Sequence, residues 1–128
     1  MSEWVLSYEG FDQNNEMLRE ALTTTGNGYF CTRGAAEWAD CSEDHYPGTY
    51  MHGGFDRAIT IMAGRPVVNE DLVNMPNWLP LKMSIEDSEP FSLDAVEVLS
   101  YKHEFDLKRC LLTRDFSFRD KEGREPSI

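Results

Sequence analysis

A glycine-rich segment, TGNGYFCTRG from Thr25 to Gly34, contains the residue types that could hold a phosphate group. A P-loop requires a Lys-Ser or Lys-Thr pair after its glycines, and a dinucleotide-binding loop requires a helix there. Here the glycines lead into Tyr-Phe-Cys-Thr, which favours a strand. We therefore interpret the segment as a turn that needs glycine or asparagine at positive φ. The residues of this structural motif are Gly26, Asn27, Gly28, Arg33 and Gly34.

Cysteine and histidine side chains raise the question of a metal site. Cys41 and His45 are four residues apart, whereas Cys31 and His52 are more distant. Zinc sites usually show two close pairs of ligands. This irregular cluster therefore predicts no metal, and we expect no other cofactor.

Catalytic groups are equally hard to single out. Carboxylates are abundant, but those such as Glu70 and Glu86 lie in or beside turns, not in an apolar setting that would raise a pKa. No GxSxG motif surrounds a serine. The chain by itself shows no catalytic set, and the sequence leaves open whether it is an enzyme.

Aromatic side chains could stack on sugar rings or pack in a core. Most large aromatics of a small β-domain are packed. Trp38 and Tyr46 lie in a long polar loop and are the better candidates for carbohydrate binding. Trp78, between Asn77 and Leu79, is expected to be packed.

Overall charge excludes several partners. The 128 residues carry a net charge of −11, which argues against binding of nucleic acid. No stretch is apolar enough to span a bilayer, so no membrane partner is expected. Three cysteines without a visible signal peptide favour a cytoplasmic location.

Short strand-like runs separated by turn signals dominate the chain. Good helix formers occur together only at Glu16–Leu22, with Asn14 or Asn15 as the N-cap. The segment 34–48 is predicted to be a loop. Extended runs are expected at 4–8, 29–32, 49–52, 55–60 and 113–119, with a further one around Val96, Val98 and Tyr101.

Two features near the C-terminus carry more specific predictions. Leu79, Leu81, Met83 and Ile85 alternate with other residues, which predicts a strand that returns at 91–93. Phe116 and Phe118 are placed on one face of a late strand. The turn at 120–123 is followed only by 124–128, which predicts an unfinished sheet edge.

These observations predict one domain over residues 1–128. The expected fold class is all-β, an antiparallel sandwich or barrel with at most one short helix.

Five segments in order then carry a family resemblance. They are WVLSYEGFD, GNGYFCTRG, YPGTYMHGGFDR, LVNMPNWLPLKMSI and VLSYKHEFDLKRCLLTRDFSFRD. Together they resemble the N-terminal domain of glycoside hydrolase family 65, which includes maltose, trehalose and kojibiose phosphorylases. Cys31 and Cys110 stand where that family usually has glycine, and Thr23 and Thr25 replace bulkier apolar residues.

The resemblance implies a distorted antiparallel β-sandwich, a super-sandwich of which this chain is a truncated portion. It also implies that an (α/α)₆ barrel elsewhere in the parent enzyme supplies the catalytic acid and the phosphate site. The expected role is then a non-catalytic structural and interface domain of an inverting α-glucoside phosphorylase or related hydrolase. Its expected partners are that catalytic barrel and, as a homodimer formed through sheet edges, a second copy. The alternative is a stand-alone carbohydrate-binding module that uses Trp38 and Tyr46 on an α-glucoside.

Overall fold

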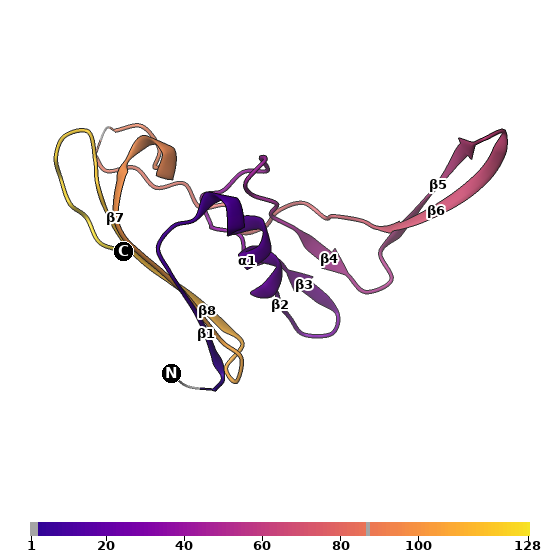
Figure 1. Cartoon of the computed structure of the whole chain (residues 1–128), viewed down its shortest axis with the longest axis horizontal. Helices are drawn as coiled ribbons and strands as arrows, with labels where there is room; N and C mark the ends of the chain where they lie inside the picture. Colours follow the sequence, from indigo (N-terminus) through magenta and orange to yellow (C-terminus); the bar gives the residue numbers. More distant parts are fainter. Residues whose placement is uncertain (1–2, 87) are drawn as a thin grey trace.

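Antiparallel β-strands are the main regular secondary structure of this chain (Figure 1), whose computed structural model describes residues 3–86 and 88–128. The strands are β1 (Val5–Glu9), β2 (Thr25–Gly26), β3 (Phe30–Thr32), β4 (Thr49–Met51), β5 (Phe55–Met62), β6 (Arg65–Leu72), β7 (Glu97–Asp106) and β8 (Leu111–Arg119). The helical elements are α1 (Glu16–Leu22) and two 3₁₀ turns, η1 (Gln13–Asn15) and η2 (Leu93–Ala95). The predicted class, an all-β antiparallel fold of the sandwich type with one short helix, is confirmed.

The described strands form three sheets. Their orders are β1-β7-β8, β2-β3-β4 and β5-β6. The first sheet and the helix lie in the body of the molecule, and the β5–β6 hairpin extends away from it (Figure 1). Among the described residues, no helix is long and apolar enough to cross a membrane.

The core lies on one face of the β1-β7-β8 sheet. Side chains alternate between faces along a strand, so Tyr101 of β7 and Phe116 and Phe118 of β8 point inward together and are buried. Leu93 of η2 completes this buried cluster. Burying each large apolar side chain stabilises the fold by about 1.5–3 kcal/mol. The prediction that Phe116 and Phe118 share a face is confirmed.

The C-terminal segment pairs back onto β8. Phe116 and Ile128 exchange two backbone hydrogen bonds of 2.9 Å, and the Phe118 N–H donates to the Pro126 carbonyl at 3.2 Å. The predicted turn at 120–123 is therefore present. The expectation of an unfinished edge here is wrong along residues 116–118, because the short tail reaches far enough to occupy it.

The strand predicted from Leu79 to Ile85 is also wrong. This segment has no regular secondary structure in the described chain. Its backbone bonds go to scattered partners: the Leu81 N–H donates to the Glu37 carbonyl at 2.8 Å, and the Met83 carbonyl accepts from Phe91 at 2.7 Å. Pro80 has no N–H to give to a ladder. The alternation instead places Met83 and Ile85 against the core while Leu81 stays exposed.

The predicted returning strand at 91–93 is likewise absent. Leu93 begins the 3₁₀ turn η2, and Phe91 packs its ring against the core.

Helix α1 begins and ends where the sequence predicts. Asn15 occupies the N-cap position, but its side chain makes no capping bond and donates instead to Asp12 Oδ2 at 2.7 Å. Two carboxylates of the helix, Glu16 and Glu20, are buried. A short helix of this kind depends on tertiary contacts, and Glu20 provides them through His45 and Tyr46.

The hairpin β5–β6 protrudes from the body of the molecule (Figure 1), and we call it the arm. Its two strands pair in register from Phe55↔Leu72 to Met62↔Arg65. Ala63 and Gly64, at φ 50° and 76°, form the tip, as a two-residue hairpin turn requires. The sequence correctly predicted β5 but placed the turn one residue late and left most of β6 unassigned.

Candidate functional site

The glycine motif is a compact turn between β2 and β3. The Asn27 side-chain oxygen accepts the N–H groups of Tyr29 and Phe30 at 3.0 and 3.2 Å. Gly28 has φ of 87°, which favours glycine. A Cβ on Gly26 would lie 2.8 Å from the Cβ of Cys31, so a side chain has no room there. The N–H groups of Asn27, Tyr29 and Phe30 are therefore used within the turn.

Arg33 leaves this turn and enters a cluster of charges. Its guanidinium donates to the Met17 carbonyl at 2.9 Å and lies 3.9 Å from the carboxylate of Glu20. It also lies over the ring of Tyr46, 5.3 Å from the ring centroid. Arg33 thus pairs with both a backbone carbonyl and a carboxylate.

Glu20 is the centre of that cluster and is 1% exposed. One carboxylate oxygen lies 2.7 Å from Nδ1 of His45, and the other accepts the Tyr46 N–H at 2.9 Å. The hydrogen bond to Glu20 raises the pKa of His45, and it outweighs the opposing effect of burial. Glu20 therefore fastens helix α1 to the loop at 34–48.

Arg114 makes the equivalent connection from β8. Its guanidinium donates to both carboxylate oxygens of Glu37 at 3.0 Å and to the carbonyl of Gly34. Gly34 lies against Thr23, where a Cβ would clash. Glu16, near this guanidinium, has a raised pKa because it is buried, although its ion pair with Arg19 at 3.0 Å opposes the rise. These charges join the helix, the loop and the sheet.

His103 of β7 lies inside the same region and is 1% exposed. Neither ring nitrogen has a hydrogen-bond partner, and the nearest ring is that of Tyr8, at a centroid distance of 6.0 Å. Burial lowers the pKa of His103 to about 4, and the charges of Arg114 and Arg19 add to the effect. His103 is therefore neutral at pH 7 and acts as a packed aromatic side chain.

A hollow of about 480 Å³ opens beside the loop, and we call it the Trp38 hollow. Its lining includes Phe11, Gln13, Trp38, Asp40, Asp44, His45, Lys82 and Phe91. The Trp38 ring contacts Phe91 and Phe116 at centroid distances of 5.2 and 4.9 Å and is half-buried. Tyr46 is exposed but does not line the hollow. Only one of the two predicted sugar-binding residues, Trp38, therefore lines this hollow.

Polar groups at the rim of the Trp38 hollow already have partners. Lys82 donates to Asp40 at 2.8 Å, and Gln13 donates to Asp44 at 2.6 Å. An aromatic wall with hydroxyl-binding groups at its rim has the chemistry that recognises a sugar. The two carboxylates of its lining, Asp40 and Asp44, are the acceptors of these two bonds.

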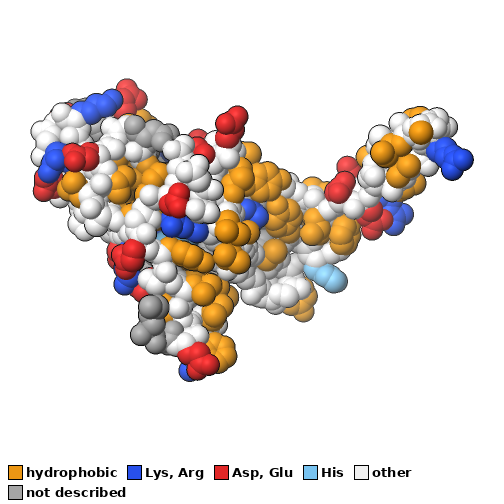
Figure 2. Space-filling model, viewed as in Figure 1, with side chains coloured by type: hydrophobic (Ala, Val, Ile, Leu, Met, Phe, Trp, Pro, Cys, Tyr) orange, Lys and Arg blue, Asp and Glu red, His pale blue; other side chains and the backbone are white. Residues whose placement is uncertain are grey.

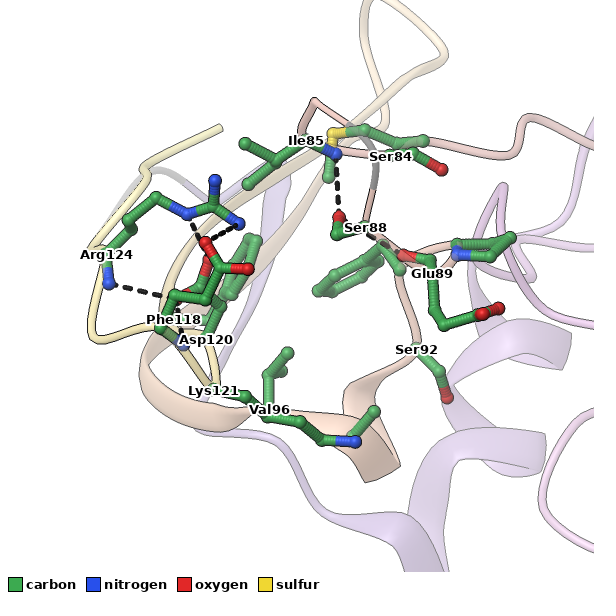
Figure 3. A pocket seen from close by; sticks show the side chains of 15 residues that line it. Ser84, Ile85, Ser88, Glu89, Ser92, Val96, Phe118, Asp120, Lys121 and Arg124 are labelled. Atoms are coloured by element: carbon green, nitrogen blue, oxygen red, sulfur yellow. Dashed lines mark hydrogen bonds and ion pairs between the residues drawn. The ribbon is translucent and has the colours of Figure 1, made fainter.

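A second pocket, of about 240 Å³, lies between residues 83–85 and 88–92 on one side and the turn after β8 on the other (Figure 3). Phe118, Val96 and Ile85 form apolar walls. Asp120 at the rim accepts from Arg124 Nε at 2.6 Å. Asp120 is thus paired, whereas Glu89 and Lys121 also line the pocket.

A third hollow, of about 300 Å³, faces away from the core on the β2-β3-β4 sheet. It is lined by Tyr29, Phe30, Thr49, Met51, Met75 and Trp78. The prediction that Trp78 is packed is wrong: it is 61% exposed, although its indole N–H donates to Thr32 at 3.1 Å. The flanking residues Asn77 and Leu79 gave no sign of this exposure, because it depends on where the loop crosses the sheet.

No group of three or more metal-ligating side chains occurs in the described part of the chain. His45, which sequence spacing paired with Cys41, has its Nδ1 bonded to Glu20.

Comparison with known proteins decides the family. The sequence profile of the glycosyl hydrolase family 65 N-terminal domain matches residues 6–128. The chain belongs to this family. An uncharacterized glycosyl hydrolase of Mycobacterium tuberculosis is 48% identical over 121 residues, which are 94% of this chain and 9% of that protein. A kojibiose phosphorylase of Caldanaerobacter subterraneus is 34% identical over 127 residues, covering 99% of this chain and 15% of that enzyme.

A trehalose 6-phosphate phosphorylase of Lactococcus lactis is 41% identical over 85 residues, which are 66% of this chain and 11% of that enzyme. The family 65 N-terminal domain described here thus spans between 9% and 15% of the length of these relatives. The family resemblance inferred from the five sequence segments is confirmed.

Proposed function

We propose that this family 65 N-terminal domain is a non-catalytic structural and interface module of a larger inverting α-glucoside phosphorylase or related hydrolase of carbohydrate metabolism. The observation that carries the proposal is the small share of each relative that the chain covers. The internal use of its charges supports it as well. Glu20, Arg33 and Arg114 are bonded to other parts of the chain and not directed into a cleft.

The proposed partner is the catalytic portion of that enzyme, which the family resemblance expects to be an (α/α)₆ barrel. The proposed location is the cytoplasm, which agrees with the three cysteines being free. Neither nucleic acid nor a membrane is a proposed partner, because the chain is acidic.

Turnover measurements test this role. The purified chain is incubated with phosphate and kojibiose, trehalose or maltose, and glucose 1-phosphate and glucose are measured. We expect no product above the buffer control. Sustained release of product that scales with the concentration of chain would overturn the proposal.

A sugar-binding module is the second candidate, and the Trp38 hollow favours it. Its aromatic wall and the polar rim formed by Gln13 and Lys82 would contact an α-glucoside. An NMR titration with millimolar kojibiose or trehalose is expected to shift the Trp38 indole signal in the wild type and less in Gln13→Ala. Lys121→Ala, whose residue lines the other pocket, is the control. Identical spectra with and without sugar would rule this candidate out.

The homodimer remains a prediction, but a different strand edge now supports it. The edge of β8 that motivated it is occupied by the C-terminal segment, whereas β1 pairs only with β7 among the described strands and has a free outer edge. Light scattering at high protein concentration tests it, and a monomer at every concentration would contradict it.

A further inference from the structure

The two faces of the arm differ in character. In the register of β5 and β6, one face presents Phe55, Ile59, Ile61, Pro66, Val68 and Leu72, and we call it the apolar face. One polar pair crosses it, Arg57 and Glu70, whose atoms lie 2.6 Å apart. The opposite face is largely polar, and there the Asn69 amide donates to the Thr60 hydroxyl at 2.9 Å. A ribbon with one apolar face is built to be covered on that face.

Nothing in the described chain covers the apolar face. Ile59, Ile61 and Val68 are 70%, 66% and 62% exposed. An isolated two-stranded hairpin is marginally stable in water, and it usually needs packing on one side. The hollow lined by Met51 and Trp78 adds further exposed apolar side chains, and Met51 closely precedes β5 in the chain. Figure 2 shows hydrophobic side chains at the surface both on the arm and where it joins the body.

The area of the apolar face indicates whether its partner is a separate molecule or part of the same polypeptide. With a rise of about 3.4 Å per residue and a strand spacing of about 4.8 Å, one face of an eight-residue ribbon offers roughly 250–300 Å². Two such faces stacked from two copies would bury about 500–600 Å², whereas a stable interface between free partners needs roughly 1,000 Å² or more. A second copy bound arm to arm is therefore too small a contact to persist.

A partner in the same polypeptide does not need so large a contact area. Covalent linkage gives an effective concentration on the order of millimolar, so a small apolar contact is enough. The relatives supply such a polypeptide, because 85% or more of each lies outside the region matched by this chain.

We propose that the apolar face of the arm is a docking surface for the remaining polypeptide of the family 65 enzyme. This rests on the proposed function and adds the place of contact to it. The partner surface is apolar, with a polar group opposite Arg57 and Glu70 to meet the one charged pair that would otherwise be buried without further bonds.

Two adjacent valines allow a matched test. Val68 lies on the apolar face and Val67 on the opposite face, so Val68→Lys and Val67→Lys make the same chemical change on the two sides. Each is made in the isolated chain and in a chimera. In the chimera, this chain replaces the corresponding segment of the Caldanaerobacter subterraneus kojibiose phosphorylase, which aligns with 99% of it.

In the isolated chain both variants are expected to melt within about 1 °C of the wild type, since both side chains are exposed, Val68 to 62% and Val67 to 37%. In the chimera, Val68→Lys is expected to lower the melting temperature by about 2 °C or more and to reduce kojibiose phosphorolysis, while Val67→Lys keeps both.

The outcomes separate the two proposals. An active chimera in which Val68→Lys and Val67→Lys behave alike overturns the docking surface and leaves the proposed function standing. A wild-type chimera that folds but does not phosphorolyse kojibiose, or does not fold, contradicts the proposed function. A dimer of the isolated chain that Val68→Lys alone dissociates assigns the face to a second copy and overturns the docking proposal.

Discussion

At the scale of single residues, this domain uses its buried charges to hold its own parts together. The carboxylate of Glu20 is hydrogen-bonded to His45 and to the Tyr46 N–H, and it forms a longer ion pair with Arg33. A buried carboxylate is tolerated only when its oxygens are paired. The cluster therefore has a structural role, and substitutions in it should lower the free energy of unfolding.

Glu20→Ala is expected to destabilise the fold by about 3 kcal/mol, because it leaves buried partners without their acceptor. Urea denaturation followed by circular dichroism measures the change. Glu43→Ala, in the same loop but exposed, is the control and should stay within about 0.5 kcal/mol of the wild type. Equal stability of the two variants would contradict the role given to Glu20.

His103 predicts a loss of stability in acid. Its pKa of about 4 in the fold lies below the ordinary value of 6.5, so the neutral form is favoured by folding. The stabilisation from the neutral form is complete above pH 6.5 and is lost as the pH falls toward 4, by roughly 3 kcal/mol in total. The raised pKa of His45 acts in the opposite sense: its contribution is present below pH 6.5 and is lost as the pH rises through the folded-state pKa.

Thermal melts between pH 7 and pH 4 check this dependence. His103→Leu should flatten the profile in that window, and an NMR titration of the wild type should show the His103 ring still neutral at pH 5. An ordinary titration near pH 6.5 would contradict its burial as a neutral ring.

Cys110 gives a third prediction at this scale. Its φ of 52° is a conformation that favours glycine, and the family resemblance expects glycine at this position. Cys110→Gly should therefore raise stability by about 1 kcal/mol. Cys41→Gly, at an exposed cysteine without positive φ, should not. Denaturation midpoints of the two variants measure the change in stability. A Cys110→Gly variant that is less stable than the wild type would contradict the left-handed conformation of residue 110.

At the scale of elements, local patterns predicted those segments in which neighbours in sequence decide the structure. Helix α1 and strand β8 follow from helix formers and from the spacing of Phe116 and Phe118. The segment Leu79–Ile85 did not follow its alternation, because half-buried side chains can alternate without a neighbouring strand to pair with. The Glu20 cluster was not predicted, since its members come from 25 residues apart and no local signal links them.

The arm also shows which properties local sequence patterns cannot predict. Its strand β5 was predicted from β-branched residues, but the sequence could not show that the hairpin leaves the body with its apolar face uncovered. That property depends on what lies beside it in space. Trp78 was misplaced for the same reason.

At the scale of the whole molecule, the chain is an acidic β-domain with a paired polar interior and an exposed apolar arm. It carries a net charge of −11, which favours solubility, and its relatives continue well beyond the matched region. Both features fit a module whose work is to support another part of an enzyme. The Trp38 hollow would add sugar contact to this proposed supporting role.

Kojibiose phosphorolysis by three proteins tests this role most directly. They are the isolated chain, the Caldanaerobacter subterraneus enzyme lacking the segment that aligns with this chain, and the chimera in which this chain replaces it. If the domain is a non-catalytic support, the chimera alone forms glucose 1-phosphate. Product formed by the isolated chain, or a shortened enzyme as active as the chimera, would contradict it.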